Sequence, residues 1–180
     1  MKFKDIPKFL QAHYEIHVSW KYMEDTLSLW SDRGHKRELQ GGLNMNPDYQ
    51  RGHVWTREQQ IKFVEYGLMG GEVGKVIIFN CPDWGDSYKS PVELVDGKQR
   101  IEAVRAFLRN EIPAFGFKYS EFEDKMGHLE PNFEFRVCKI KTRSGIIQLY
   151  LSINAGGTPH SQEELERVNK LLISEMEKEN

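Results

Sequence analysis

Apolar residues recur along the chain with two periods, which predict a mixture of strands and helices. Residues 14–20 (YEIHVSW) and 133–140 (FEFRVCKI) alternate between apolar and polar side chains, as half-buried strands do. Short β-rich apolar runs at 75–80 (KVIIFN) and 92–95 (VELV) predict two more strands, both bounded by polar or turn-forming residues.

Between these runs the apolar residues follow a helical spacing. Thr56 and Gln59 form a capping-box signature ahead of the best-defined helix. The predicted helices span residues 21–31, 57–69, 143–153 and 161–177, and the last of these is acidic. A further helix is predicted after the DGKQR segment, where Ile101, Val104 and Leu108 recur at helical spacing. The sequence therefore predicts an α+β fold with one core, as a single domain over residues 1–180.

Composition narrows the class of protein. The 180 residues include 25 Lys and Arg against 27 Asp and Glu, a net charge of −2 that excludes a globally basic nucleic-acid coat but leaves room for a local basic patch. No apolar run approaches the ~20 residues of a membrane span. Cys81 and Cys138 are the two cysteines and form no CxxC pair. With no apolar segment of signal-peptide type after Met1, we expect a cytoplasmic protein that does not contact a membrane.

The richest local feature is Asp96-Gly97-Lys98-Gln99-Arg100, between the strand at 92–95 and a helix. Gly97 permits a sharp turn and close approach of a ligand. The unpaired N–H groups of the helix start attract anions, and Lys98 and Arg100 add positive charge. Asp96 is suited to hold a metal ion, accept a proton or orient a hydroxyl group. The alternative is an ordinary strand–helix turn in which Asp96 caps the helix.

A second feature is the segment 46–55 (NPDYQRGHVW), just before the helix at 57–69. Tyr49, His53 and Trp55 could contact a base or substrate, and Arg51 could reach phosphate. The alternative is that Tyr49 and Trp55 anchor the core while Arg51 pairs with an acidic neighbour. For Trp55 we favour the core.

Asn154 ends the helix at 143–153 and precedes Gly156-Gly157. The pair of glycines is typical of a helix C-cap, and Asn154 could also lend a polar contact to a site built elsewhere. The chain has no HExxH, GxSxG or Walker-type GxxxxGK[ST] motif, which excludes the corresponding metalloprotease, hydrolase and P-loop signatures.

Three segments in fixed order, NPDYQR-x-x-VW, VDGKQR and INAGGTPHSQEEL, resemble the N-terminal domain of GmrSD-type modification-dependent restriction proteins, over roughly residues 14–170. That family belongs to the ParB/sulfiredoxin-like superfamily. The resemblance implies a small mixed sheet with flanking helices and a DGKQR box that cradles nucleotide phosphates. It assigns the site to Gln50, Arg51, Asp96, Gly97, Gln99, Arg100 and Asn154.

The resemblance also implies NTP-dependent action on DNA that carries modified bases. Lys98 stands where the family usually has Gln, which adds a phosphate-seeking charge. The chain ends at Asn180, which leaves no room for the nuclease domain of full-length relatives. We therefore expect a stand-alone version. A phage-encoded protein of this kind would act in the host cytoplasm.

The first functional hypothesis is an NTPase or kinase that uses NTP, with ATP as the leading choice, and Mg²⁺. In this hypothesis Asp96 acts as general base or metal ligand, and Arg51 and Arg100 neutralise phosphate charge. Gln50, Gly97, Lys98, Gln99 and Asn154 would bind the nucleotide, while Tyr49 and His53 would contact the acceptor, for which a hydroxymethylated base in DNA is one candidate.

Two other hypotheses remain open. One is a non-catalytic module that binds DNA or a partner, using a basic cluster such as Lys139, Lys141 and Arg143. The other is a nuclease subunit that needs a second chain. A homodimer is compatible with all three hypotheses.

Overall fold

The fold is built on a five-stranded mixed sheet in a computed structural model that describes residues 12–31, 41–52, 54–124, 126, 131–154 and 162–179. The strand order is β1-β5-β3-β4-β2. The strands are β1 (Tyr14–Ser19), β2 (Leu43–Asn44), β3 (Val76–Asn80), β4 (Val92–Asp96) and β5 (Asn132–Cys138). The predicted α+β class is confirmed.

The strands pair in both directions. β5 runs antiparallel to β1 and parallel to β3, while β4 runs antiparallel to β3 and parallel to β2. β2 has only two residues, too short for an alternating pattern, and it was not among the predicted strands. Its parallel pairing with β4 brings the segment that follows it alongside the strand that ends at Asp96.

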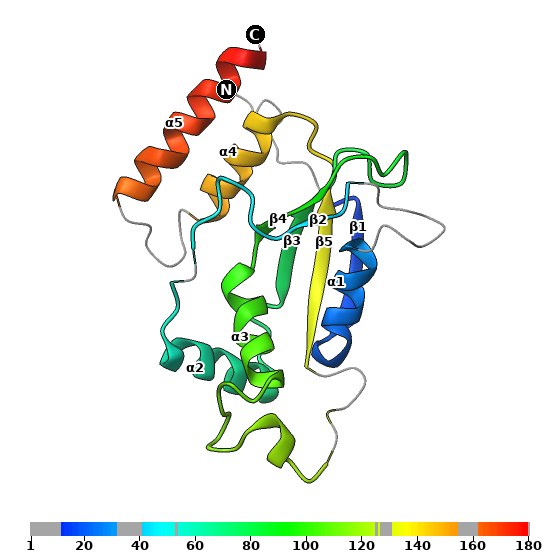
Figure 1. Ribbon diagram of the computed structural model, residues 1–180, viewed down its shortest axis with the longest axis vertical. Helices are drawn as coiled ribbons and strands as arrows, with labels where there is room; N and C mark the ends of the chain where they lie inside the picture. The colour runs from blue at the N-terminus through cyan, green and yellow to red at the C-terminus, as the bar shows by residue number, and fades with distance from the viewer. Residues whose placement is uncertain are drawn as a thin grey trace, which may run out of the picture.

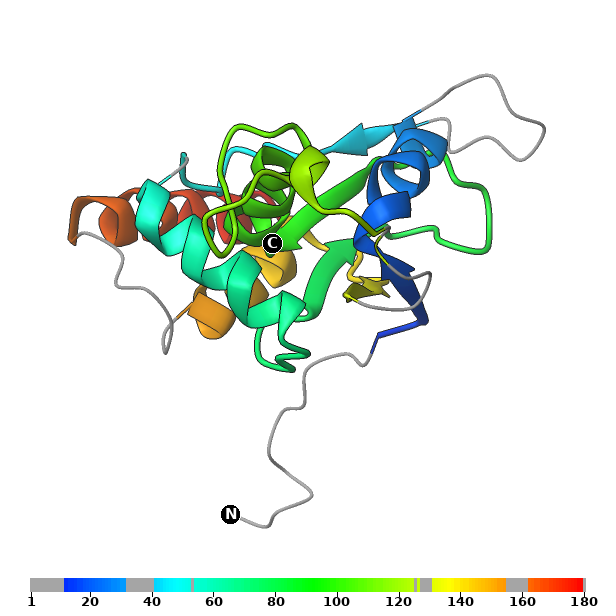
Figure 2. The same ribbon diagram turned by 90° about the horizontal axis from the view of Figure 1, so that it is seen from below.

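Helices cover both faces of the sheet (Figures 1 and 2). Helices α1 (Met23–Ser31) and α3 (Lys98–Leu108) lie on one face, with α2 (Arg57–Leu68) packed beside α3. Helix α4 (Arg143–Asn154) lies on the other face, and α5 (Gln162–Glu179) packs against α4. The described residues also form two 3₁₀ turns, η2 (Trp20–Tyr22) and η3 (Tyr119–Glu121).

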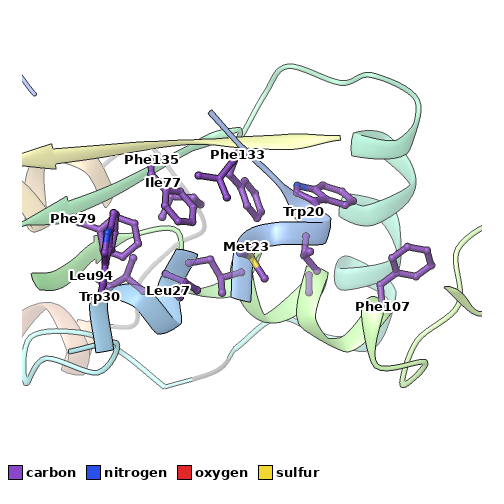
Figure 3. Close-up of a cluster of buried hydrophobic side chains, with 14 of the residues drawn as sticks. Trp20, Met23, Leu27, Trp30, Ile77, Phe79, Leu94, Phe107, Phe133 and Phe135 are labelled. Atoms are coloured by element: carbon purple, nitrogen blue, oxygen red, sulfur yellow. The ribbon is translucent and has the colours of Figure 1, made fainter. Parts of the chain in front are cut away.

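The main core lies between the sheet and α1, α2 and α3, and it follows from strand alternation. Ile77 and Phe79 of β3 point to this face, while Ile78 between them points to the other. Figure 3 shows the side chains that interdigitate here, namely Trp20, Met23, Leu27, Trp30, Ile77, Phe79, Leu94, Phe107, Phe133 and Phe135, all buried.

A smaller core forms on the opposite face, beneath α4 and α5. Ile78 and Val95 contribute from the sheet, and Ile147 and Val168 contribute from the two helices. The helix pair is therefore fixed over the end of β4, which is where Asp96 stands.

The helix boundaries agree with the sequence patterns. The capping box at Thr56 and Gln59 is present in both directions and begins α2 at Arg57. The acidic C-terminal helix, predicted over 161–177, spans Gln162–Glu179.

Candidate functional site

The junction between β4 and α3 adopts the predicted strand–turn–helix geometry. Gly97 is the N-cap of α3 with φ of 109°, and an added Cβ would lie 2.4 Å from Cδ1 of Ile77. Glycine is thus required both by the backbone conformation and by the close approach to β3. Among the described residues no side chain caps the start of α3, so the alternative in which Asp96 caps the helix is not formed. The first-turn N–H groups therefore have no side-chain acceptor in the described part of the chain.

A pocket of about 210 Å³ opens in front of this helix start. Three segments form its wall: the loop before α2, the β4–α3 junction and the end of α4. Of the residues predicted for the site, the structure brings eight together in this wall: Gln50, Arg51, Asp96, Gly97, Lys98, Gln99, Arg100 and Asn154.

Asp96 and Arg100 form an ion pair across the first turn of α3, and both side chains are largely buried. The Arg100 guanidinium also donates to the main-chain oxygens of Gly74, at 3.0 Å, and Val76, at 2.7 Å. Arg100 therefore ties α3 to the start of β3, and its charge is balanced by Asp96. Arg100 therefore has a structural role, holding α3 against β3, which the sequence did not indicate.

Arg51 and Lys98 supply the remaining positive charge of the pocket wall. The Lys98 ammonium donates to the main-chain oxygen of Arg51 at 3.2 Å, so the two cationic residues are neighbours although 47 positions apart. Together with the first-turn amides of α3, they make this wall electropositive.

Two glutamines hold the loop that carries Arg51. Gln50 Nε2 donates to the main-chain oxygens of Leu94, at 3.0 Å, and Val95, at 2.7 Å. Gln99 Oε1 accepts the main-chain N–H of Trp55 at 3.2 Å and that of Val54 at 3.0 Å, and its Nε2 donates to Gly52 at 3.0 Å. These bonds use the amides to position the loop, whereas the sequence predicted that both glutamines contact nucleotide.

The third wall comes from α4. Asn154 donates to the main-chain oxygen of Tyr150 at 2.8 Å, within the same helix. Tyr150 and Ile153 also line the pocket and were missed by the sequence reasoning. Tyr150 lies one helical turn before Asn154 and so shares its face, whereas Ile153 directly precedes Asn154 in α4. Burial raises the pKa of Tyr150, and the positive charge of Arg51 opposes that rise.

The structure places Tyr49 in the core and Trp55 at the wall of the pocket. Tyr49 is fully buried, with its ring 5.3 Å from that of Tyr150 and the Arg143 guanidinium 4.9 Å above it, so direct contact with a substrate is corrected to a core role. Burial, and then the charge of Glu93, raise the pKa of Tyr49. Trp55, assigned to the core, is half-buried and packs against the main core, with its ring 5.4 Å from that of Phe63, and it also lines the pocket.

Some predicted residues fall outside the described residues. They are His53, considered for substrate contact, and the Gly156-Gly157 turn that follows Asn154.

The side chains of the pocket wall fit a Mg²⁺ ion only if a bound nucleotide supplies further ligands. Among the described residues, no three His, Cys, Asp or Glu side chains come together as a metal cluster. Asp96 is the carboxylate of the pocket wall. Mg²⁺ is commonly held by one or two carboxylates plus substrate phosphates, so Asp96 suits a Mg²⁺ ion that arrives with a nucleotide rather than one held by protein ligands alone.

The basic cluster considered for DNA contact is largely neutralised. Lys139 pairs with Asp86 at 2.8 Å, and Arg143 pairs with Glu93 at 2.7 Å and with Asp48. Of the three cluster residues only the exposed Lys141 lacks such an ion pair in the described part of the chain. An open basic stripe is therefore not formed here.

Within the described residues, no helix combines the length and apolar character needed to cross a bilayer.

Comparison with known proteins identifies a family for this chain. Residues 34–136 match the family model of the GmrSD restriction endonuclease, N-terminal domain. Searches of curated proteins and of solved structures gave no significant match. The matched segment contains both the Gln50–Arg51 loop and the DGKQR junction, whereas α4 and α5 follow it. With more than half of its 180 residues matched, the chain belongs to the family of GmrSD restriction endonuclease N-terminal domains.

Proposed function

We propose that the pocket binds the phosphates of an NTP, with ATP as the first choice, and that the protein transfers or hydrolyses the terminal phosphate in a DNA restriction pathway. The observation that supports this most is the uncapped start of α3, which faces the same pocket as Arg51 and Lys98. Phosphoryl transfer needs mainly positioning and stabilisation of phosphate charge, and these groups supply both.

In this proposal the first-turn amides of α3 hold phosphate oxygens, as helix N-termini do in many anion sites. Arg51, from the loop before α2, and Lys98, in the first turn of α3, neutralise phosphate charge. Gly97 allows the backbone to approach the phosphates without a side chain in between.

Asp96 has two possible tasks in the same proposal. It accepts a proton from the attacking water or hydroxyl, or it would hold a Mg²⁺ ion, which would supply positive charge against the phosphates. Either task requires Asp96 to loosen its ion pair with Arg100 when the nucleotide binds. The guanidinium then remains anchored by the main-chain oxygens of Gly74 and Val76.

The acceptor decides the reaction class. Water would make the protein an NTPase, and a hydroxyl group, such as that of a hydroxymethylated base in DNA, would make it a kinase. The family match places relatives in DNA restriction, which supports DNA as the polymer to test first.

The test follows a labelled phosphate. The protein is incubated with each γ-labelled NTP and Mg²⁺, in the presence of ordinary or hydroxymethyl-base DNA. Label in free phosphate indicates an NTPase, and label in DNA indicates a kinase. If no NTP loses its label under any of these conditions, catalysis is excluded for this chain.

A further inference from the structure

A second, wider cavity adjoins the phosphate pocket. Its volume is about 640 Å³, and Trp55 and Lys98 belong to the walls of both cavities. We call this cavity the groove, defined by Asn46, Trp55, Arg57, Gln60, Lys98, Glu102, Ala106, Glu111 and Ile112. Neither the family segments nor the phosphate chemistry uses most of these residues.

Size alone separates what the two cavities can hold. Small-molecule sites typically measure about 300–1,000 Å³. The pocket, at about 210 Å³, falls below that range and suits a chain of phosphates, whereas the groove lies within it. Because Lys98 lies in both walls, a ligand whose phosphates fill the pocket continues past Lys98 into the groove.

Helix α3 sets the order of groups along this path. Lys98, Glu102 and Ala106 are four residues apart, so they lie on one face of the helix. Each step along this stripe advances about 6 Å from the helix start. A phosphate site at the N-terminus is followed by a carboxylate and then by a small apolar residue.

The groove has the chemistry of a nucleoside site rather than of a second phosphate site. Arg57 and Lys98 are balanced by Glu102 and Glu111, so the lining carries no net charge. Glu102 also pairs with Arg105 at 2.7 Å. A lining without net charge offers no net attraction to additional phosphates, and its carboxylates can accept hydrogen bonds from hydroxyl groups.

Other groups of the groove lining match a nucleobase. The half-buried indole of Trp55 offers an aromatic face, and Ala106 and Ile112 offer apolar contact. The side chains of Asn46 and Gln60 bring amide donors and acceptors to the same cavity, as the polar edge of a base requires.

We propose that the groove binds the nucleoside of the NTP whose phosphates occupy the pocket, which rests on the proposed function. Trp55 stacks on the base, and Glu102 accepts hydrogen bonds from the sugar hydroxyls, a task that an acidic residue performs in other nucleotide sites. The groove thus selects a nucleoside triphosphate over a bare polyphosphate.

The test compares two probes, each NTP and inorganic tripolyphosphate, by equilibrium binding with Mg²⁺. The best NTP should bind about 10-fold more tightly than tripolyphosphate, in line with one base–aromatic stack. Gln60→Trp fills the groove from α2 and should reduce NTP binding to the level of tripolyphosphate while leaving tripolyphosphate binding unchanged. Gln148→Trp, at an exposed position of α4, is the matched control and should change neither.

The outcomes separate the two proposals. If neither probe binds, the phosphate site itself fails. If tripolyphosphate binds as tightly as every NTP, or if Gln60→Trp leaves NTP binding unchanged, the nucleoside assignment is overturned while the phosphate site stands. It is also overturned if Gln60→Trp weakens binding of single-stranded DNA but not of NTP, since the groove would then serve the polymer. Trp55→Phe should keep most of the NTP preference and Trp55→Leu should lose it.

Discussion

The guanidinium of Arg167, in α5, donates to the main-chain oxygen of Tyr49 at 3.3 Å. The same group donates to the main-chain oxygens of Asp48, at 2.5 Å, and Gln50, at 3.4 Å. One side chain from the C-terminal helix thus holds three consecutive residues just before Arg51. Because α5 follows the segment that matches the family, this support comes from outside that segment.

We expect Arg167→Ala to weaken nucleotide binding several-fold, because the loop that carries Arg51 loses an anchor. The free energy of unfolding should fall by about 1 kcal/mol, or about 2–4 °C in Tm, since these bonds are partly exposed. Lys170→Ala, at an exposed position on the same helix, is the control. Nucleotide binding and thermal unfolding are measured for both variants. Equal results for the two would show that Arg167 does not support the loop that carries Arg51.

Gly97 gives a test of the junction. Gly97→Ala places a Cβ 2.4 Å from Ile77 in a backbone with φ of 109°, so it should destabilise by about 1–3 kcal/mol in urea unfolding. Gly85 also has a positive φ, of 80°, but open space around its Cβ position. Gly85→Ala therefore measures the backbone cost alone and should be the milder change. Equal losses would mean that the approach of α3 to β3 is not tight.

Substitution of each partner in the Asp96–Arg100 ion pair should separate an effect on turnover from an effect on stability. Asp96→Asn retains an oxygen for Arg100 and should preserve the fold, while turnover should fall about 10²–10⁴-fold through loss of the proton acceptor or metal ligand. Retention of full turnover in a folded Asp96→Asn variant would remove Asp96 from the chemistry.

Arg100→Ala should behave differently. It leaves the main-chain oxygens of Gly74 and Val76 without this donor, so the free energy of unfolding should fall by about 1–3 kcal/mol. Chemical denaturation measures this loss, with Arg109→Ala at an exposed site as control. A variant as stable as the wild type would show that the tie between α3 and β3 contributes nothing.

Because the thiol of Cys81 is buried, we expect the free energy of unfolding to fall at alkaline pH. Burial, and then the hydrogen bond to Asp83, raise the pKa of the Cys81 thiol to about 12, above the 9.0 of a free thiol. The folded protein keeps a proton that the unfolded chain loses, so stability is fully present below about pH 9 and is lost as pH rises toward 12. Between pH 8 and pH 11 the free energy of unfolding should fall less steeply with pH in Cys81→Ala than in the wild-type protein. Identical slopes in the two proteins would contradict this prediction.

The sequence predicted most of the elements because their patterns are local. The alternation in β5 and the capping box at Thr56 are properties of a few consecutive residues, and both are present. The strand order could not be predicted, because pairing between β1 and β5 depends on residues more than 100 positions apart. β2 has too few residues to show a period.

For the candidate site, the motifs located the residues but not what each one touches. Gln99 reads as a ligand contact in the DGKQR segment, yet it binds main-chain groups of the loop at 52–55. Trp55 reads as core, yet it lines two cavities. Such assignments depend on partners 44 or more positions away, which no short motif encodes.

The phosphate site at the start of α3 is tested most directly by a nitrogen–proton NMR titration of the labelled protein with a non-hydrolysable NTP analogue and Mg²⁺. We expect the backbone amides of Gly97, Lys98 and Gln99 to shift most, together with that of Arg51. We also expect Lys98→Gln to weaken the apparent affinity about 10-fold, while Lys170→Gln does not. Saturating analogue that leaves these amides unmoved, or that shifts residues elsewhere instead, would contradict the phosphate site at the start of α3.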